Sequence, residues 1–417
     1  MGKTTEELYN ESLKRVNDAI ALKAPDRVPI IPVIQAFPMY YSGVTIKDAM
    51  YDYREKATLA FDKFFEDFKP DLGWDPIFMF PAKVLDILDL QWFRWPGNGV
   101  EDNRMYQFVE GEFMTGDEYE EFASDPTNFI LSKYLPRCFT SLKGFENLSS
   151  IRQSIWLGWF TSFPRSFAAK ETRDSFKAVM EATDILMDWL TYLVEYGQKM
   201  KNQWGVPVAY GGFSFAPFDL LGDTMRGTVP IMMDIRRRPE QLLKAIDALI
   251  PISIEMGVRG AQATGIPYIW MWLHKGVDEF MSDEQFRTFY WPSLLKVVNA
   301  LVDEGLVPII YGEGSMNNRL EVMRELPKGK TVCHFENVDM AKAKDVLGDV
   351  ACISGNVPNA LLCTGTPQDV KDYCKFLIDV CGKDGGFMLD TNALVDEAKP
   401  ENMKAMFEFT KEYGRYY

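Results

Sequence analysis

Apolar and polar positions alternate along the chain in two recurring periods. Short apolar runs rich in β-branched residues predict buried strands, and apolar residues spaced three or four apart predict helices. From residue 228 the two kinds of segment follow one another regularly, with predicted strands IPYIWMWLHKG, LVPIIYGEG, TVCHFEN, VACISGNV and GGFMLD and predicted helices 238–261, 282–303, 318–326, 339–346, 367–382 and 400–413. Repeated strand-then-helix units over most of the chain predict an α/β fold, a single (β/α)8 TIM barrel, rather than an open sheet.

The hydrophobic pattern in the first half of the chain predicts the remaining strand-and-helix units of the barrel and an insertion. A helix over 4–24 precedes the strand VPIIPVIQAF, a helix over 46–68 precedes DLGWDPIFMF, and a helix over 166–203 precedes VPVAYGGFSFAPFDLLG. Residues 85–165 break this order, and the alternation in MYQFVEGEFM predicts an antiparallel hairpin arm over 100–116. We expect one domain, 1–417, whose insertion (approximately 85–165) covers a site or builds the face of a homodimer.

The charge and composition of the chain exclude some classes of binding partner. The chain has 45 Lys and Arg against 60 Asp and Glu, a net charge of −15, which argues against nucleic acid or an anionic membrane as a partner. The first residues are charged and helical, and no apolar run reaches the ~20 residues of a membrane span, so we expect no signal peptide and a cytoplasmic location. The six cysteines form no CxxC pair and are expected to be reduced.

Only two histidines, His274 and His334, are available for histidine chemistry. Glu313 lies at the end of the predicted strand LVPIIYGEG, and His334 lies in TVCHFEN, the next strand along the chain. A strand, a helix and a strand in succession place the two side chains on neighbouring parallel strands, where they can share a metal. Catalytic zinc sites usually offer three protein ligands. Glu336 and Asp390 are both candidates for the third.

Aromatic side chains gather at the predicted strand ends, where barrel active sites form. They are Phe37, Tyr40, Trp74, Phe213, Phe215, Trp270, Trp272 and Tyr311. Asp75 follows Trp74 at the same place. An aromatic substrate would pack against such a wall. We therefore predict substrate contacts at Phe37, Tyr40, Trp74, Asp75, Phe213 and Trp272, with His274 available to hydrogen-bond a substituent or to supply a proton to a leaving phenolate.

Four segments together resemble the uroporphyrinogen decarboxylase superfamily of (β/α)8 barrels. They are YQFVEGEFMTGDEYEEFASDP, FMSDEQFRTFYWPSLLKVV, GDVACISGNVPNALLCTGTPQDV and GGFMLDTNALVDEAKPENMKAM. The porphyrin decarboxylases of that superfamily carry an arginine-rich turn after the first strand. This chain has VIQAFPMYYSG there, with Gln35 and Phe37 among its residues. Porphyrin decarboxylation is therefore not expected.

The other branch of the superfamily contains zinc-dependent methyltransferases that exchange methyl groups with a corrinoid protein. Members that act on thiols bind zinc through a His-x-Cys pair and a distal cysteine, but this chain has Tyr311, Glu313 and Ala393 at those places. The methyltransferase components of anaerobic aryl-ether O-demethylases use a glutamate and a histidine twenty residues further on, which Glu313 and His334 match. The resemblance implies bound Zn²⁺ on these two residues and demethylation of an aryl methyl ether. From their places at the predicted strand ends, His274 and Tyr311 are the residues that we expect to act in catalysis.

The resemblance also implies that the corrinoid comes from a separate protein, because neither histidine lies in a DxHxxG-type loop. A zinc with carboxylate and imidazole ligands keeps more Lewis acidity than one with thiolates, which suits an ether. Three alternatives stay open. They are a methyltransferase for another donor (methylamine, betaine or methanol), a metal-free decarboxylase, and a barrel that binds a ligand without catalysis.

Overall fold

The computed structural model describes residues 2–416 and is built around a six-stranded parallel sheet in the order β4-β5-β6-β7-β8-β9. The strands are β4 (Gly212–Phe215), β5 (Tyr268–Leu273), β6 (Val307–Ser315), β7 (Val332–Asn337), β8 (Cys352–Ser354) and β9 (Phe387–Met388). Sheet order follows chain order, as short right-handed crossovers require. The sheet confirms the predicted α/β fold.

Two further extended segments continue the sheet at its ends. Ile30 forms an isolated parallel bridge with Leu389 beside β9, and Gly73 forms one with Val208 ahead of β4. The Asp71 amide donates to the Ile30 carbonyl at 2.8 Å, which links the two segments to each other. Backbone hydrogen bonds thus join eight extended segments in a ring. Between residues 27 and 75 the joins are single bridges and bonds rather than continuous ladders.

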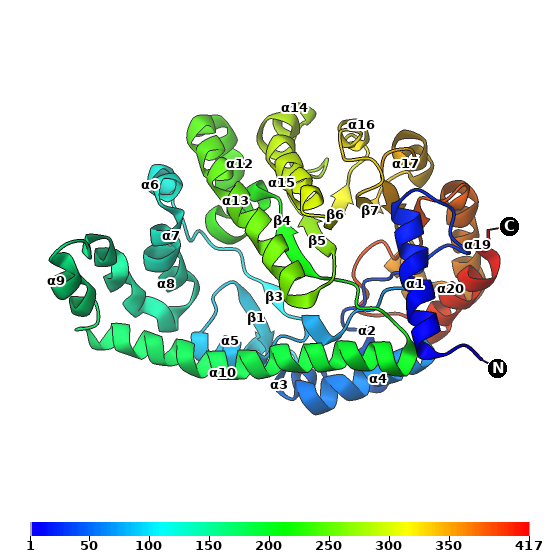
Figure 1. Ribbon diagram of the computed structural model, residues 1–417, viewed down its shortest axis with the longest axis horizontal. Coiled ribbons are helices and arrows are strands. Elements are labelled where there is room, and N and C mark those ends of the chain that lie inside the picture. The colour runs from blue at the N-terminus through cyan, green and yellow to red at the C-terminus, as the bar shows by residue number, and fades with distance from the viewer. Residues whose placement is uncertain (1, 417) are drawn as a thin grey trace.

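Helices cover the outside of the sheet (Figure 1). They are α1 (Thr5–Ile20), α2 (Phe37–Ser42), α3 (Ile46–Tyr51), α4 (Thr58–Asp67), α11 (Pro217–Leu221), α12 (Thr228–Arg237), α13 (Pro239–Thr264), α14 (Asp283–Gln285), α15 (Trp291–Asp303), α16 (Leu320–Met323), α17 (Met340–Leu347), α18 (Asn359–Thr364), α19 (Pro367–Leu377) and α20 (Pro400–Tyr413). Their buried faces and the sheet make one large hydrophobic core. No helix in residues 2–416 combines the length and apolar character that a bilayer crossing requires.

The insertion is an arm that projects from the barrel at the left of Figure 1. It contains α5 (Ala82–Leu88), β1 (Phe93–Pro96), β2 (Gly99–Val100), β3 (Gln107–Phe108), α6 (Tyr119–Ser124), α7 (Pro126–Phe129), α8 (Leu135–Cys138) and α9 (Gly158–Arg165), and it returns along the 30-residue helix α10 (Lys170–Lys199). The predicted hairpin is smaller than MYQFVEGEFM suggested. Only two residue pairs join β1 to β3, and residues 109–115 form no strand.

A buried ion pair joins the arm to the barrel. Arg226 is almost fully buried and donates to the Asp234 carboxylate at 2.6 and 2.9 Å. From the arm, the Tyr119 hydroxyl donates to the same carboxylate at 2.8 Å, and the Met114 carbonyl accepts from Arg226 at 2.6 Å. Each buried charge is hydrogen-bonded, which is the condition under which burial is tolerated.

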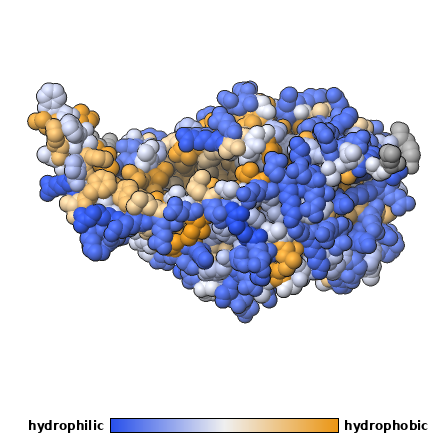
Figure 2. Space-filling view, turned by 60° about the horizontal axis from the view of Figure 1, so that its bottom comes forward, coloured by the Kyte–Doolittle hydropathy of each residue, from blue (hydrophilic) through white to orange (hydrophobic). Residues whose placement is uncertain are grey.

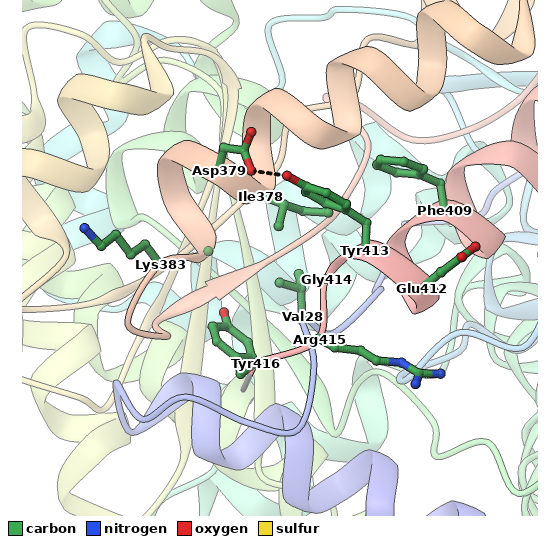
Figure 3. A pocket seen from close by; sticks show the side chains of 11 residues that line it. Val28, Ile378, Asp379, Lys383, Phe409, Glu412, Tyr413, Gly414, Arg415 and Tyr416 are labelled. Atoms are coloured by element: carbon green, nitrogen blue, oxygen red, sulfur yellow. Dashed lines mark hydrogen bonds between the residues drawn. The ribbon is translucent and has the colours of Figure 1, made fainter.

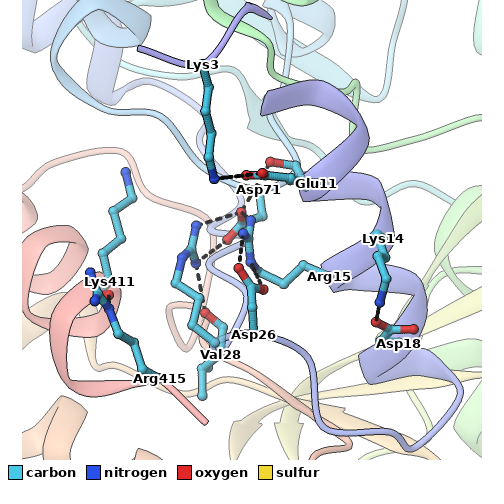
Figure 4. A network of polar contacts seen from close by, with 12 residues as sticks. Lys3, Glu11, Lys14, Arg15, Asp18, Asp26, Val28, Asp71, Lys411 and Arg415 are labelled. Atoms are coloured by element: carbon cyan, nitrogen blue, oxygen red, sulfur yellow. Dashed lines mark hydrogen bonds and ion pairs between the residues drawn. The ribbon is translucent and has the colours of Figure 1, made fainter. Parts of the chain in front are cut away.

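A second buried network ties α1 to the first extended segment (Figure 4). The carboxylate of Asp71 lies between Arg15, at 2.5 Å, and Arg27, at 2.7 Å, and it also accepts the Ile30 amide at 2.8 Å. Burial opposes the charge on Asp71, but the two guanidinium groups hold its pKa below the ordinary value. This end of the barrel is therefore stabilised by α1.

A cavity of about 590 Å³ lies near these residues, between the helical turn Ile378–Gly382 that follows α19 and the last turn of α20 (Figure 3). Its lining includes Val28, at the beginning of the first extended segment, and the hydrogen-bonded pair Asp379 and Tyr413. Active sites of (β/α)8 barrels form at the opposite, carboxyl ends of the strands. The functional site of this barrel is therefore expected at the carboxyl ends of its strands.

Candidate functional site

His274 and Glu313 face each other at the carboxyl ends of β5 and β6. The His274 Nε2 atom is 3.4 Å from the Glu313 Oε2 atom, and both side chains are about one-third exposed. Glu313 lies where the pairing register between β6 and β7 shifts, between Gly312 and Ser315. Such a bulge turns a side chain away from the ladder. Burial raises the pKa of the Glu313 carboxyl.

Two carboxylates behind His274 hold it in place. Its Nδ1 atom is 2.6 Å from Asp223, and its backbone amide donates to Asp219 at 3.0 Å. Burial disfavours the charged imidazole, but Asp223 outweighs it and raises the pKa of His274 to about 9. Burial, with Asp223 nearby, raises the pKa of Asp219 to about 6. Lys275 closes the cluster through a 2.5 Å bond to Asp223.

His334 occupies a deeper and drier place on β7. It pairs with Tyr311 in the parallel ladder, and the two rings stack at 3.8 Å with an interplanar angle of 3°. Its Nε2 atom is 3.2 Å from the Asn392 carbonyl, and its Nδ1 atom is 3.1 Å from the Asp390 Oδ2 atom. Among the described residues neither that Nδ1 nor that Oδ2 has a hydrogen-bond partner, and the buried Tyr311 hydroxyl also has none.

Aromatic rings run without a break from the second extended segment to His334. Trp74 stacks on Tyr210 at 5.4 Å, Tyr210 on Phe213 at 5.1 Å, and Phe213 contacts Trp272 at 5.2 Å. Trp272 in turn lies 6.3 Å from Tyr311. We call these rings the aromatic wall: Trp74, Tyr210, Phe213, Trp270, Trp272 and Tyr311.

Asp75 is buried beside the aromatic wall. The Tyr210 hydroxyl donates to its two carboxyl oxygens at 2.9 and 3.0 Å, and the Ile77 amide donates at 3.1 Å. Burial raises the pKa of Asp75 to about 7, since neither donor offsets the loss of water. Asp75 is thus a carboxyl that titrates near neutral pH inside the barrel.

The other two predicted substrate residues lie apart from the aromatic wall. Phe37 is buried in α2, where its ring contacts Tyr41, Phe64 and Phe68. Tyr40 donates its hydroxyl hydrogen to the Asn103 carbonyl of the insertion. The contacts described for Phe37 are thus those of a core residue. Tyr40 connects the barrel to the insertion.

Zinc fits these residues only in part. Two ligands of one tetrahedral zinc lie about 3.3 Å apart, because zinc bonds to nitrogen and oxygen measure ~2.0–2.2 Å. The His334–Asp390 and His274–Glu313 separations both agree with this value. If the Nε2–H of His334 donates to Asn392, the bare Nδ1 faces a carboxylate, an arrangement that a cation would satisfy. No three His, Cys, Asp or Glu side chains in residues 2–416 converge as ligands, however.

Sequence reasoning missed Asp219, Asp223 and Tyr210. The run VPVAYGGFSFAPFDLLG reads as one long strand, but β4 ends at Phe215 and α11 begins at Pro217. Proline at the first position of a helix was the available signal. With the helix placed correctly, Asp219 and Asp223 follow a strand end and belong to the expected site.

The family model described as "Uroporphyrinogen decarboxylase (URO-D)" matches residues 164–413, more than half of the chain. The chain belongs to the URO-D family. URO-D enzymes of two bacteria are similar to it: that of Chlorobium phaeovibrioides is 27% identical over 146 residues, and that of Chlorobaculum tepidum is 24% identical over 244 residues. These matches cover 33% and 55% of this chain, and 40% and 66% of the relatives' own lengths.

A solved structure matches this URO-D family chain over its whole length. It is a methyltransferase from Methanosarcina mazei, with a TM-score of 0.58, 15% sequence identity, and coverage of 99% of both chains. At this identity the match shows the fold. The barrel and its insertion thus have a counterpart among solved structures.

Proposed function

We propose that this URO-D family chain is a methyltransferase that demethylates an aryl methyl ether and transfers the methyl group to the cobalt of a separate corrinoid protein. The observation that carries the proposal is the aromatic wall, which ends at His334 and runs beside the His274–Glu313 pair. A phenyl ring would pack on Phe213 and Trp272, the two rings of the wall that are only partly buried. The carboxyl and imidazole groups beside the wall can donate a proton or hold a metal ion at the ether oxygen of the substrate.

His274 is the residue that we assign to the leaving phenolate. Asp223 holds its Nδ1 side, so its Nε2 atom is directed toward Glu313 and the strand ends. A proton donated from Nε2 to the ether oxygen would neutralise the phenolate as the carbon–oxygen bond breaks. Tyr311 stacks on His334 and fixes the plane of its ring.

Zinc belongs to this proposal. His334 and Asp390 would hold it, and Glu313, which pairs with His274 on the neighbouring strand, would have to turn toward them to become the third ligand. Bound there, it would supply Lewis acidity toward the ether oxygen. The orphaned His334 Nδ1 and Asp390 Oδ2 atoms support this assignment and favour Asp390 over Glu336.

Decarboxylation of a porphyrin is the second candidate, because the curated relatives carry that name. The residues at the carboxyl ends of the strands do not suit a porphyrin substrate. A substrate with many carboxylates needs cations, but the described titratable groups there are mainly acidic: Asp219, Asp223, Glu313, Glu336, Asp390 and Asp396. The basic groups in contact with them, His274 and Lys275, are both bound to Asp223.

The test supplies purified protein with free cob(I)alamin and a panel of aryl methyl ethers, and follows methylcobalamin by its absorbance. We expect methylation that depends on the ether, about one zinc per chain by elemental analysis, and loss of both in a His334→Ala, Asp390→Ala variant. An Asp345→Asn variant, changed on the exposed face of α17, serves as the control.

Methylation by methylamine, betaine or methanol alone would reassign the donor. Release of carbon dioxide from a porphyrinogen, with no methyl transfer from any donor, would establish the decarboxylase instead. Full zinc content in the His334→Ala, Asp390→Ala variant would refute the ligand assignment.

A further inference from the structure

Tyr106 brings a hydroxyl group from the arm to the carboxyl ends of the strands, which we call the barrel mouth. The Gln35 Nε2 atom, at the end of the first extended segment, donates to this hydroxyl at 3.3 Å. The Tyr106 ring packs on Phe93 at 4.7 Å and on Phe80 at 5.3 Å. The arm that supplies Tyr106 is rich in apolar side chains at the left of Figure 2. Tyr106 thus places a polar atom at the end of an apolar segment.

The loop that precedes Tyr106 is fastened to the barrel. The Tyr40 hydroxyl of α2 donates to the Asn103 carbonyl. Arg104 lies 3.6 Å from the Glu397 carboxylate, in the loop that follows β9. These contacts come from two different sides of the barrel mouth. They hold the arm, and with it the Tyr106 hydroxyl, in a fixed place.

Gln35 lies between the His334–Asp390 pair and the aromatic wall. On one side of the first extended segment, the Val33 amide donates to the Asp390 carboxylate at 3.3 Å. On the other side, the second extended segment carries Trp74, where the aromatic wall begins. A substrate ring bound between the wall and Asp390 would therefore have Gln35 beside it.

Carboxylates surround the Tyr106 hydroxyl. Burial raises its pKa against the hydrogen bond from Gln35, and the charges of Asp396 and Glu313 raise it further, so both acids lie within electrostatic reach. The Asp396 carboxylate accepts the Ala36 amide at 3.2 Å. Burial raises the pKa of Asp396 to about 6, which leaves it mainly ionised at neutral pH. A second anion would be repelled here.

The Tyr106–Gln35 pair has one unused donor and one unused acceptor. The Tyr106 oxygen accepts from Gln35, but its hydrogen meets no acceptor within residues 2–416. The Gln35 Oε1 atom accepts from no donor in the same part of the chain. A hydroxyl group matches this pair, because it accepts one hydrogen bond and donates another. A carboxylate has no hydrogen to donate.

We propose that Tyr106 and Gln35 bind a hydroxyl substituent on the ring of the aryl methyl ether, so that the substrate is an uncharged methoxyphenol rather than a methoxybenzoate. This inference rests on the proposed function and names its substrate class. The substituent accepts from the Tyr106 hydroxyl and donates to Gln35 Oε1. Tyr106 acts on specificity, since it binds the ring substituent and not the ether oxygen that reacts.

The first test measures binding without any corrinoid. Calorimetry at pH 7.5 compares the three methoxyphenols with the matching methoxybenzoates and with methoxybenzene. We expect one methoxyphenol to bind at least about tenfold more tightly than its methoxybenzoate and than methoxybenzene. Tyr106→Phe keeps the ring packing and should remove this preference, as should Gln35→Met. Tyr41→Phe, whose hydroxyl donates to the exposed side of Asp67, is the matched control and should bind like wild type.

The second test follows the methylation of cob(I)alamin. Tyr106→Phe should raise KM for the preferred methoxyphenol roughly tenfold with kcat nearly unchanged, because the substituent is bound equally before and during methyl transfer. KM for methoxybenzene should not change.

The two tests separate this inference from the proposed function. Methoxybenzoates that bind as tightly as methoxyphenols, an unchanged preference in Tyr106→Phe, or a protein that binds none of these compounds would overturn the inference. Methoxyphenol binding that depends on Tyr106, without methylation of cob(I)alamin, would support the binding subsite and refute the proposed methyl transfer.

Discussion

Asp75 gives the clearest quantitative test of the barrel interior. Its pKa is raised from 3.8 to about 7 because it is buried beside Trp74 and Tyr210 with too few donors to replace water. The folded state therefore holds this proton more tightly than the unfolded chain. Stability from Asp75 is fully present below pH ~4 and is lost as the pH rises through about 7.

An Asp75→Asn variant removes this dependence, because asparagine has the shape of the protonated acid and cannot ionise. A shift of about three units corresponds to ~4 kcal/mol at most, and ~2.6 kcal/mol of it falls between pH 5 and pH 8. We expect the free energy of unfolding of the variant, relative to wild type, to rise by that amount over this range. Urea denaturation at pH 5, 6, 7 and 8 measures it.

Two controls sharpen the result. Asp345→Asn, on the exposed surface of α17, should give a difference near zero at every pH, since water solvates that carboxylate in both states. Tyr210→Phe removes the hydroxyl that donates to Asp75 and should move the loss of stability to higher pH. A difference between Asp75→Asn and wild type that does not change with pH would refute the reasoning.

Two further predictions concern buried polar groups. Arg226→Met leaves the Asp234 carboxylate buried without its main partner and should lower the free energy of unfolding by ~3–5 kcal/mol, whereas Arg238→Met, at a partly exposed partner of the same carboxylate, should cost at most ~1 kcal/mol. Equal losses would contradict this. Tyr311→Phe removes a buried hydroxyl that has no described hydrogen-bond partner, so metal-free protein should be as stable as wild type or up to ~2 kcal/mol more stable in urea. A clear loss would show that the hydroxyl has a partner.

The spacing of apolar residues predicted the strands and helices of the barrel well where these elements are long and regular. From residue 238 onward the predicted strands and helices are present, with α20 at residues 400–413 as predicted, but α16 is shorter than the predicted helix 318–326 and α18 was not predicted. The first extended segments were harder, because VPIIPVIQAF reads as a strand but is joined to its neighbours only through single bridges. Its prolines lack the amide hydrogen that a continuous ladder needs.

The succession of a strand, a helix and a strand in the sequence also predicted that Glu313 and His334 lie on neighbouring strands, and the sheet order confirms this. That succession does not predict which side chains lie nearest to Glu313 and His334. Glu313 faces His274 because a bulge interrupts β6, and His334 faces Asp390 across a distance of 56 residues in sequence. Such contacts depend on register and on side-chain packing, which no local pattern encodes.

Because of the bulge in β6, strand pairing constrains the two candidate metal ligands Glu313 and His334 to different degrees. His334 belongs to the ladder, so its ring plane is set by strand pairing and by the stacked Tyr311. Residue 313 stands in the interruption, where a change of side chain does not disturb the pairing on either side. Such a site can exchange one donor atom for another while the barrel keeps its shape. Diversification of chemistry within this fold would then need a substitution at one position rather than a rearranged sheet.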